Sequence, residues 1–501
     1  MRTLGDIARL GQRRYADKTA ISMGGDSLTY AGFNRRVNQV ANQLIDMGVK
    51  PGDRVAIFAN NCLDYAVYPY AAAKCAAIAV PINFRFQRRE LIYVINNAGP
   101  VVLFVDAGLA ALVDEAAAEF ENPPTIIPMS GQSGGDVSEP TVSVDPQSAA
   151  MIMFTSGTTG FPKGVLFSHA AYLAVAHCHL IEGDLDRHDR VMIPLPLFHN
   201  GGLNALLMPT LMVGAEAIIT RRGFDPGEIL QTIEEYKITL TMLVPTMLAM
   251  LINHADAAGH DLSSLKKIWY GSSPISPTVL QAAMALFDAG FYQLYGQTES
   301  GMNSILRPED HAARSQCTGR EMLSAELRIV NEDGSESGPN EIGEILSAQQ
   351  PLGMIGYFND KQATDEAIRD GWIHTGDLAR VESDGYFTIV GRKKEMIISG
   401  AENIYPKEIE DAVVTHPAVR EVAVFGIPDE TFGESVCAAV VLHSGASATD
   451  QEIIDYCSEH IAGYKRPRHV EFHAELPKNA AGKITKNQLR APHWAGMEKV
   501  I

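Results

Sequence analysis

The stretch Thr155-Ser-Gly-Thr-Thr-Gly-Phe-Pro-Lys-Gly164 decides how the rest of this sequence is interpreted. It follows an apolar run at residues 149–154 that predicts a buried strand, and it precedes a helical pattern at residues 170–181. Such a loop suits a polyphosphate, because glycine lets backbone N–H groups approach oxygen, hydroxyls donate and lysine neutralises charge. It is not a Walker A loop, since Pro162 stands where that pattern needs glycine.

The composition restricts the classes of protein to consider. With 501 residues the chain is too long for one ordinary core, so two or more domains are expected. A hydrophobic content of 46% and a mean hydropathy of -0.02 are typical of a soluble globular protein. A formal net charge of -19 argues against nucleic acid as a partner, because its phosphates require a basic surface.

The cysteines and the chain ends predict a cytoplasmic protein. The 6 cysteines are scattered without a C-x-x-C pair, which fits free thiols in a reducing compartment. Residues 1–6 lack the apolar segment of a signal peptide, and no apolar run is long enough to be a transmembrane segment. Residues 498–501 match no peroxisomal or lipidation signal.

Alternating strand and helix patterns predict an α/β fold. Apolar runs such as residues 54–58, 101–105 and 239–244 alternate with helical patterns such as residues 62–74 and 201–213, which indicates parallel sheets covered on both faces. Residues 120–145, rich in Pro, Gly and Ser, are expected to form a long connection before the phosphate loop. A hairpin is expected around Gly24-Gly25. Beyond Gly319, short strands with turns predict a small β-barrel, followed by a smaller C-terminal α+β unit.

The opening stretch carries the whole phosphate-loop signature T-S-G-T-T-G-x-P-K-G, and here the sequence resembles the adenylate-forming superfamily. That superfamily contains acyl-CoA synthetases, peptide-synthetase adenylation domains and firefly luciferase. The resemblance implies a large N-terminal adenylation domain at residues 1–391 and a small mobile C-terminal domain at residues 392–501. It also implies ATP as the ligand of the loop, through Thr155, Ser156, Gly157, Thr158, Thr159, Gly160 and Lys163.

A second motif, Tyr295-Gly-Gln-Thr-Glu-Ser300, follows a predicted strand. Its threonine and glutamate offer hard oxygen ligands suited to Mg²⁺, which shares a carboxylate with substrate phosphates. The motif resembles the family's Y-G-x-T-E, which implies that Thr298 and Glu299 serve Mg²⁺ and ATP. The adenine end is then lined by Tyr295, Gly296 and Gln297, with Gly271, Ser272 and Ser273 beside it.

Three further motifs acquire roles from the resemblance. Trp372-Ile-His-Thr-Gly-Asp377 implies that Asp377 binds ribose, although Thr-Gly-Asp alone predicts only a β-turn. Arg392 is then a second ribose contact and Lys394 the hinge. Leu476-Pro-Lys-Asn-Ala-Ala-Gly-Lys483 fits P-x-N-x-x-G-K, which implies that Lys483 is the catalytic lysine. Three competing lysines are set aside: Lys163 belongs to the phosphate loop, and Lys478 and Lys486 miss the frame.

The acyl and CoA sites are less sharply indicated. By resemblance His199 borders the substrate carboxylate, and the alternative is a packed histidine at a strand end. Glycines in this region would leave room for a chain or an aryl ring. The expected acyl pocket is His199, Asn200, Gly201, Gly202, Tyr270, Gly271, Gly301 and Met302; the expected CoA residues are Gly400, Phe432, Gly433, Lys465 and Arg466. His177 and His179 are two apart on a predicted helix and do not share a face, so packing is expected there instead of a metal site.

The resemblance implies an acyl-CoA synthetase. Such an enzyme uses ATP and Mg²⁺ to convert a carboxylic acid into acyl-AMP and then forms a thioester with CoA. A medium- or long-chain fatty acid is the expected substrate, and an aryl or cinnamate-type acid is the close second. The alternatives are an acyl-AMP ligase that loads a carrier protein, a luciferase-like oxygenase and a non-catalytic nucleotide-binding module. The assembly stays open, with a homodimer among the expectations.

Overall fold

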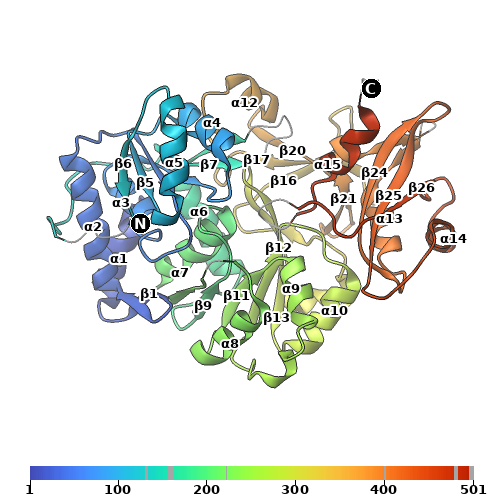
Figure 1. Ribbon diagram of the computed structural model, residues 1–501, viewed down its shortest axis with the longest axis horizontal. Helices are drawn as coiled ribbons and strands as arrows, with labels where there is room; N and C mark the ends of the chain where they lie inside the picture. Colours follow the sequence, from blue (N-terminus) through green and yellow to red (C-terminus); the bar gives the residue numbers. More distant parts are fainter. Residues whose placement is uncertain (130–133, 156–161, 222, 400–401, 479–482, 496–501) are drawn as a thin grey trace.

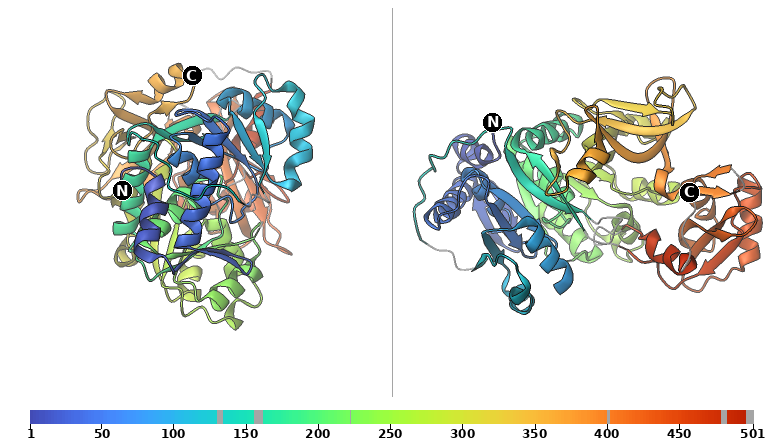
Figure 2. Two further views of the ribbon diagram at one scale, coloured as in Figure 1. Left: turned by 90° about the vertical axis from the view of Figure 1, so that its left-hand side faces the viewer. Right: turned by 90° about the horizontal axis from the view of Figure 1, so that it is seen from above.

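The computed structural model describes residues 1–129, 134–155, 162–221, 223–399, 402–478 and 483–495. The chain as far as β21 (Phe387–Arg392) builds a large body, and the chain from β22 (Ile397–Ser399) onward builds a smaller lobe at one end of the longest axis (Figure 1). The view from above shows the same separation (Figure 2). The sheets therefore change between Arg392 and Ile397, while the domain division at 391/392 stays a prediction.

One sheet of the large body has the strand order β15-β14-β13-β12-β11-β9-β10-β1-β2. Its bounds are β1 (Thr19–Met23), β2 (Asp26–Thr29), β9 (Arg190–Ile193), β10 (Glu216–Ile219), β11 (Leu240–Leu243), β12 (Lys267–Gly271), β13 (Gly290–Gln297), β14 (Gly301–Leu306) and β15 (Arg320–Glu321). Strands from β1 to β13 along this order pair in parallel. The expected hairpin around Gly24-Gly25 is confirmed as the antiparallel β1–β2 pair.

The second sheet of the large body has the order β18-β8-β7-β4-β3-β5-β6. Its bounds are β3 (Arg54–Phe58), β4 (Ile78–Ile82), β5 (Val102–Val105), β6 (Thr125–Pro128), β7 (Ala149–Thr155), β8 (Lys163–Ser168) and β18 (Gly356–Tyr357). β7 and β8 form an antiparallel pair in which Thr155 lies opposite Lys163, so the two ends of the predicted phosphate loop meet. Residues 120–145, predicted as a plain connection, include β6, which pairs with β5.

Helices separate and cover the two sheets, as the α/β prediction requires. Their bounds are α1 (Gly5–Tyr15), α2 (Tyr30–Asp46), α3 (Tyr68–Lys74), α4 (Arg88–Ala98), α5 (Ala110–Ala116), α6 (His169–Glu182), η3 (Gly201–Leu207), α7 (Met208–Val213), α8 (Pro226–Tyr236), α9 (Pro245–Ile252), α10 (Pro277–Leu286), α11 (His311–Arg314) and α12 (Lys361–Ala367). The main core joins α1–α3, α6 and α7 to both sheets. A second core lies under α8–α10, and a third under α4 and α5. Among the described helices, none combines the length and the apolar character that crossing a membrane requires.

Two predicted helices differ from those observed. The helix predicted to begin at Cys62 begins only at Tyr68, because Pro69 suits the first turn of a helix and not its middle. Residues 201–213, predicted as one helix, begin as the π-helix η3 and become α-helical at Met208. The wider π-turn lies where Gly202 approaches the Pro196 carbonyl, which a Cβ would meet at 2.4 Å.

A third sheet, at the place of the expected small barrel, is antiparallel. Its strands are β16 (Leu327–Val330), β17 (Ile342–Ala348), β19 (Ile368–Arg369), β20 (Trp372–Val381) and β21. In the described residues the order β16-β17-β20-β19, with β21 beside β20, is open. The smaller lobe contains β22, β23 (Glu402–Ile404), α13 (Pro406–Val413), β24 (Val419–Asp429), β25 (Gly433–Leu442), α14 (Asp450–His460), β26 (His469–Phe472) and α15 (Lys486–Arg490).

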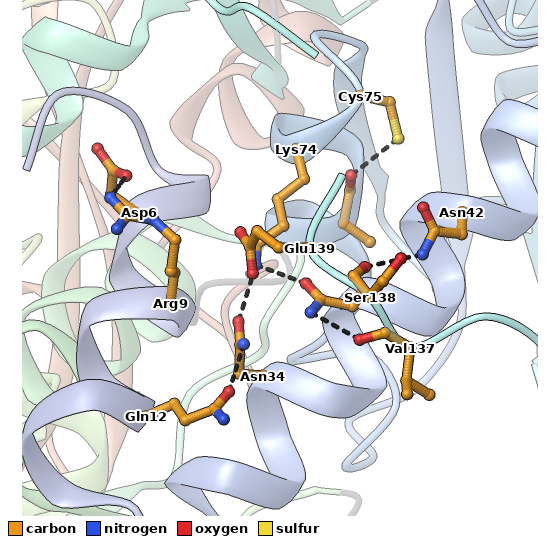
Figure 3. Close-up of polar contacts among 12 residues, drawn as sticks. Asp6, Arg9, Gln12, Asn34, Asn42, Lys74, Cys75, Val137, Ser138 and Glu139 are labelled. Atoms are coloured by element: carbon orange, nitrogen blue, oxygen red, sulfur yellow. Dashed lines mark hydrogen bonds and ion pairs between the residues drawn. The ribbon is translucent and has the colours of Figure 1, made fainter. Parts of the chain in front are cut away.

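A buried lysine holds the long connection before β7 against the large body (Figure 3). The side chain of Lys74, 4% exposed, pairs with Glu139 at 2.6 Å and donates to the amide oxygens of Asn34 and Asn38 at 2.8 and 2.6 Å. Asn38 in turn donates to the Val137 carbonyl at 3.0 Å. Burial lowers the pKa of Lys74, and Glu139 opposes that shift. The network therefore joins α2, α3 and the segment that leads to the phosphate loop.

We expect Lys74→Met to destabilise the large body, because three buried or half-buried acceptors lose their cationic donor. The loss should be about 1–3 kcal/mol in the free energy of unfolding, the usual result of leaving buried acceptors unsatisfied. Urea unfolding followed by tryptophan fluorescence measures it. Glu139→Gln is the matched control: it keeps an acceptor for Lys74 and should cost less. Equal stability of Lys74→Met and the unsubstituted protein would contradict this interpretation.

Candidate active site

The carboxylate of Asp377, inside β20, joins that strand to the ends of β13 and β21. It lies in β20, 4% exposed, opposite Arg392 of β21. Its Oδ2 accepts from the Tyr295 hydroxyl at 2.9 Å and from Gln297 Nε2 at 2.7 Å, both in β13. Its Oδ1 pairs with Arg392 Nε at 2.9 Å. Residues that the sequence assigned to adenine and to ribose are thus in direct contact.

The hydrogen-bonding capacity of Asp377 is almost filled in this arrangement. A carboxylate offers about four acceptor positions, and three are taken by Tyr295, Gln297 and Arg392. A diol that donates two hydrogen bonds must therefore displace one donor. The Arg392 side chain is 43% exposed and is the donor with most freedom to swing away. Asp377 can accept a ribose once Arg392 has moved.

Lys483 belongs to the smaller lobe and acts electrostatically on this carboxylate. It directly precedes one arm of a hairpin whose described arms are residues 477–478 and 484–485: Lys478 bridges Ile484, and the Thr485 N–H donates to the Pro477 carbonyl at 2.8 Å. Burial and the nearby Arg392 guanidinium lower the pKa of Lys483, while Glu395 and Asp377 oppose them. The amine therefore lies within electrostatic range of the Asp377–Arg392 pair.

Two competing lysines are occupied elsewhere. Lys478 Nζ pairs with Glu421 at 2.6 Å, away from Asp377. Lys163 Nζ lies 4.9 Å from the centre of the Tyr357 ring, at the start of β8. Lys483 is thus the one among these three whose charge acts on Asp377 in the described contacts.

Glu299 lies in the turn between β13 and β14, beside the phosphate-loop strands. Its Oε1 accepts from the Tyr357 hydroxyl at 2.9 Å, and its carbonyl accepts from the Met354 N–H at 2.8 Å. Lys163 Nζ lies over the same Tyr357 ring, so Tyr357 is a common neighbour of Glu299 and of the end of the phosphate loop. Thr298 precedes Glu299 in this turn and is half-buried.

His199 lies just before η3 and lines a cavity of about 210 Å³. Its Nδ1 accepts from the Gly201 N–H at 3.2 Å, so the proton of the neutral ring is on Nε2. Burial lowers the pKa of His199, which keeps the ring neutral near pH 7. The histidine can therefore offer an N–H to a ligand but supplies no charge.

The cavity gathers residues that follow the carboxyl ends of six strands, β3, β4, β9, β10, β11 and β12. The Phe84 and Phe198 rings lie in its wall, edge to face with centroids 5.4 Å apart. The lining residues are Asn60, Asn61, Phe84, Arg85, Pro194, Leu195, Pro196, Phe198, His199, Gly201, Arg221, Gly223, Phe224, Val244, Thr246, Met247, Met250 and Ser272. The space is largely apolar with polar groups at a few positions, which suits an organic acid or a thiol arm.

Several expected acyl-pocket residues lie away from this cavity. Tyr270 packs in the core under α8–α10, and its hydroxyl contacts Gln293 and His311 at 2.9 and 3.0 Å. Asn200 accepts from Asn204 at 2.6 Å, and Met302 packs against the main core. Gly301 has φ +70, and a Cβ there would meet the Leu352 carbonyl at 2.6 Å. Of the predicted set, His199 and Gly201 line the cavity.

Several glycines of the expected site lie where another backbone segment approaches, so they do not leave empty space. Gly271 ends β12, where a Cβ would meet the Leu294 carbonyl at 2.2 Å. Gly296 would place a Cβ 2.2 Å from the Gly301 carbonyl. Ser272 follows with φ +67 and lines the cavity, and Ser273 is next to it. The Gly271–Ser273 segment thus connects the cavity to the Tyr295 strand, with which Gly271 is paired in register at Leu294.

The expected CoA residues lie in the smaller lobe. Gly433, with φ +79, is opposite Ser399, and Phe432 beside it is stacked under the Arg468 guanidinium at 4.0 Å. Lys465 pairs with Glu408 at 2.7 Å, and Arg466 donates to Ser458 at 3.5 Å. None of the described residues among them lines the cavity. Lys394 is exposed in the 3₁₀ turn Lys393–Glu395 between the lobes.

Some predicted residues lie outside the described part of the chain: Ser156, Gly157, Thr158, Thr159, Gly160 and Gly400. The loop ends are described, and Thr155 Oγ1 donates to the Lys163 carbonyl at 3.4 Å. His179 is buried and its Nδ1 contacts the Val175 carbonyl at 2.9 Å, as expected for packing. No group of three or more His, Cys, Asp or Glu within the described residues could hold a metal ion.

Sequence reasoning missed Tyr357 and most of the cavity wall. Asn60, Phe84, Phe224 and Thr246 carry no motif of their own. Their signal was positional, because each follows the carboxyl end of a predicted parallel strand, where ligands bind in open α/β sheets. Tyr357 lies at β18, a two-residue strand with no detectable pattern.

Comparison with known proteins agrees with this geometry. The family model for AMP-binding enzyme matches residues 9–358, and that for AMP-binding enzyme C-terminal domain matches residues 408–483. A feruloyl-CoA synthase of Amycolatopsis sp is 36% identical over 473 residues, which cover 94% of this chain and 95% of that one. An indoleacetate–CoA ligase of Aromatoleum aromaticum is 37% identical over 485 residues, which cover 94% of each. The solved structure of ATP-bound MatB from Rhodopseudomonas palustris has a TM-score of 0.91 and 28% identity, and covers 98% of this chain and 99% of that one.

We expect Asp377→Asn to weaken ATP binding, because the carboxylate that holds Arg392, Tyr295 and Gln297 loses its charge. Hydrogen bonds to a charged group contribute about 1.5–3 kcal/mol, which corresponds to roughly 10- to 100-fold in affinity. Isothermal titration calorimetry with ATP measures the change. Asp384→Asn, at an exposed ion pair with Arg314, is the control and should bind ATP normally. Equal affinities in the two variants would remove Asp377 from the nucleotide site.

Proposed function

Because the chain belongs to the AMP-binding enzyme family, we propose that it is an AMP-forming acid–CoA ligase. It activates a carboxylic acid with ATP to give acyl-AMP, and it then transfers the acyl group to the thiol of CoA. The observation that supports this proposal most strongly is the pair of buried Asp377 with Arg392 in the large body, 2.9 Å long, on which the charge of Lys483 from the smaller lobe acts. A module that only bound nucleotide would not need a partly buried lysine at this point.

The first step overcomes the poor leaving group of a carboxylate. A carboxylate oxygen attacks the α-phosphorus of ATP, the bond to the bridging oxygen breaks, and pyrophosphate leaves with that electron pair. Such reactions depend on positioning and on neutralising charge, and fixed cations supply both. The protonated amine of Lys483 holds the attacking carboxylate against the α-phosphate. His199 offers its Nε2–H to the same carboxylate.

The nucleotide is held by residues of the large body. Asp377 and Arg392 take the ribose, Tyr295, Gly296 and Gln297 the adenine side, and Gly271–Ser273 the edge of the base. The segment 155–164, with Lys163 at its end, takes the phosphates. The donor set fits Mg²⁺, because that ion binds one or two carboxylates together with phosphate oxygens, and Glu299 with Thr298 supplies such a set. When bound, Mg²⁺ would neutralise charge on the phosphates.

The second step needs the smaller lobe to turn. Rotation about Lys394 withdraws Lys483 and presents another face of the lobe to the acyl-AMP. The residues proposed for CoA are Gly400, Phe432, Gly433, Lys465 and Arg466. The thiolate sulfur of CoA attacks the acyl carbon, and the bond to the AMP oxygen breaks. The acceptor is CoA in this proposal, and a phosphopantetheinylated carrier protein is the alternative to assay.

A cytoplasmic location and a homodimer also remain predictions.

The cavity favours an aromatic acid as the acyl substrate. A volume of about 210 Å³ is suited to an aryl ring with a short linker, and Phe84 and Phe198 supply edge and face contacts for it. The feruloyl-CoA synthase and the indoleacetate–CoA ligase among the relatives are named for aromatic acids. A fatty acid is the second candidate, because Leu195, Met247 and Met250 give the wall an aliphatic side.

We expect Lys483→Ala to separate the two half-reactions. Acyl-AMP formation, measured as pyrophosphate release with ATP and acid, should fall by about 100-fold or more, because a charged contact made at the transition state is lost. Thioester formation from supplied acyl-AMP and CoA should be largely intact, because the lobe has withdrawn Lys483 by then. Lys478→Ala, at the other end of the hairpin, is the matched control. Equal loss in both half-reactions would refute the two-face assignment.

We expect Met247→Trp to reduce the cavity and to raise the KM for an aromatic acid in pyrophosphate release, with the KM for ATP unchanged. A panel of benzoate, cinnamate and straight-chain acids measures both the substrate class and the effect. Met284→Trp, at an exposed position on α10, is the control. If instead the loss is confined to thioester formation from supplied acyl-AMP, the cavity carries the thiol arm and not the acid.

A further inference from the structure

The lysine three residues after Lys483 is one of the most tightly held cations in the smaller lobe. Lys486 is the first residue of α15, and its side chain is 18% exposed. Its Nζ lies 2.7 Å from Glu410 Oε1 and 3.2 Å from Glu395 Oε2. Sequence reasoning set this lysine aside because it misses the catalytic frame. Its contacts show that it does a different task.

The two carboxylates attach Lys486 to separate parts of the lobe. Glu410 belongs to α13, and its Oε1 also accepts from the Val424 N–H of β24 at 2.8 Å. Glu395 closes the 3₁₀ turn directly after the hinge residue Lys394. Lys486 thus joins α13, β24 and the hinge turn to the start of α15. Since Lys483 is only three residues before Lys486, these two ion pairs also fix the position of the Lys483 backbone, from which its side chain extends.

Glu395 faces both lysines. Burial would raise the pKa of Glu395, but Lys486 and Lys483 outweigh it, and the pKa lies below its usual range. Burial would lower the pKa of Lys486, but Glu410 and Glu395 outweigh it, and the pKa lies above its usual range. Without Lys486, the cations left to balance Glu395 would be Lys483 and Arg392, of which Lys483 acts on it more strongly. Lys483 would then be drawn toward the hinge turn and away from Asp377.

We propose that Lys486 is a positioning residue, which holds Glu395 and Glu410 so that Lys483 stays directed at the Asp377–Arg392 pair. The inference rests on the proposed function, because it concerns the lysine of the first half-reaction. Glu395, Glu410 and Lys486 all lie beyond the hinge, so their contacts turn with the smaller lobe. Lys483 and Asp377 belong to different lobes, so their electrostatic interaction changes when the smaller lobe turns. Lys486 therefore acts on acyl-AMP formation more than on thioester formation.

The charged groups around Lys483 predict how the pH dependence of acyl-AMP formation changes when the Lys486 cation is removed. Arg392 of β21 and Lys486 of α15 lower the pKa of Lys483, in addition to burial, and Glu395 and Asp377 raise it. Removing the Lys486 cation takes away one lowering influence and leaves Glu395 to act on Lys483. The pKa of Lys483 should then rise. Because the protonated amine is the active form, the high-pH limb of acyl-AMP formation should move to higher pH.

The test compares Lys486→Met with Lys486→Arg in the full-length enzyme, with acyl-AMP formation assayed by pyrophosphate release. Lys486→Met should lower the maximal rate by about 10- to 100-fold, the usual cost of misplacing a reacting group by ~1 Å. The KM for ATP should change little, and the high-pH limb of kcat/KM should shift upward. Thioester formation from supplied acyl-AMP should persist. Lys486→Arg should restore most of the rate, because arginine can pair with both carboxylates.

Matched variants separate positioning from simple stability. Lys478→Met removes another paired lysine of the same hairpin, and Arg490→Met removes the pair of α15 with Glu434, 3.2 Å long. Neither should move the high-pH limb. Adding Glu395→Gln to Lys486→Met should recover part of the rate, because the carboxylate that captures Lys483 is gone.

Two results would overturn the proposal. One is a Lys486→Met variant whose high-pH limb is unchanged and whose two half-reactions fall equally together with its melting temperature. The other is a Glu395→Gln second change that lowers the rate further. Absence of acid-dependent pyrophosphate release from the unsubstituted enzyme would instead count against the proposed function, which keeps the two failures distinct.

Discussion

The structure depends on one buried carboxylate that receives donors from separate strands. Asp377 is 4% exposed and accepts from Tyr295, Gln297 and Arg392. A buried charge is costly unless it is paired and hydrogen-bonded, so these partners are required by the fold as well as by any ligand. The requirement brings together two sheets, because Tyr295 and Gln297 lie in β13 and Asp377 lies in β20. The pair with Arg392 then fixes the last strand before the hinge.

The nucleotide side of the site could be predicted from the sequence far better than the acyl side. Asp377, Tyr295 and Lys483 belong to motifs whose spacing is rigid, because phosphate, ribose and the fixed charges around them do not vary between substrates. The acyl wall has no such constraint. Phe84, Phe224 and Met247 come from separate strand ends, and only the folded sheet brings them together. The glycines were a poor guide to pocket volume for a related reason. A Cβ at Gly202 or Gly301 would collide with a neighbouring carbonyl, so glycine is required there by backbone packing.

The fold could be predicted where a sequence pattern fitted one structure, and not where the pattern fitted more than one. The β1–β2 hairpin follows from Gly24-Gly25 and alternating flanks, and tertiary contacts did not alter it. Residues 201–213 are apolar at nearly every position, so helical periodicity indicates a helix but not its turn width. The π-helix lies where Gly202 approaches the Pro196 carbonyl, a contact between residues six apart that hydrophobic periodicity does not reveal.

The contacts of the smaller lobe divide into those that rotate with it and those that must break. Lys486 with Glu395 and Glu410, and Arg490 with Glu434, lie entirely beyond Lys394 and can persist through a rotation. Lys393 with Glu344, at 3.1 Å, lies before the hinge and belongs to the large body. Between these groups, the electrostatic interactions of Lys483 with Asp377 and Arg392 join residues on the two sides of Lys394, so a rotation would change them. The proposed reaction first holds the lysine and then withdraws it, and this division suits it, because ion pairs within the lobe would keep the position of the lysine through each turn.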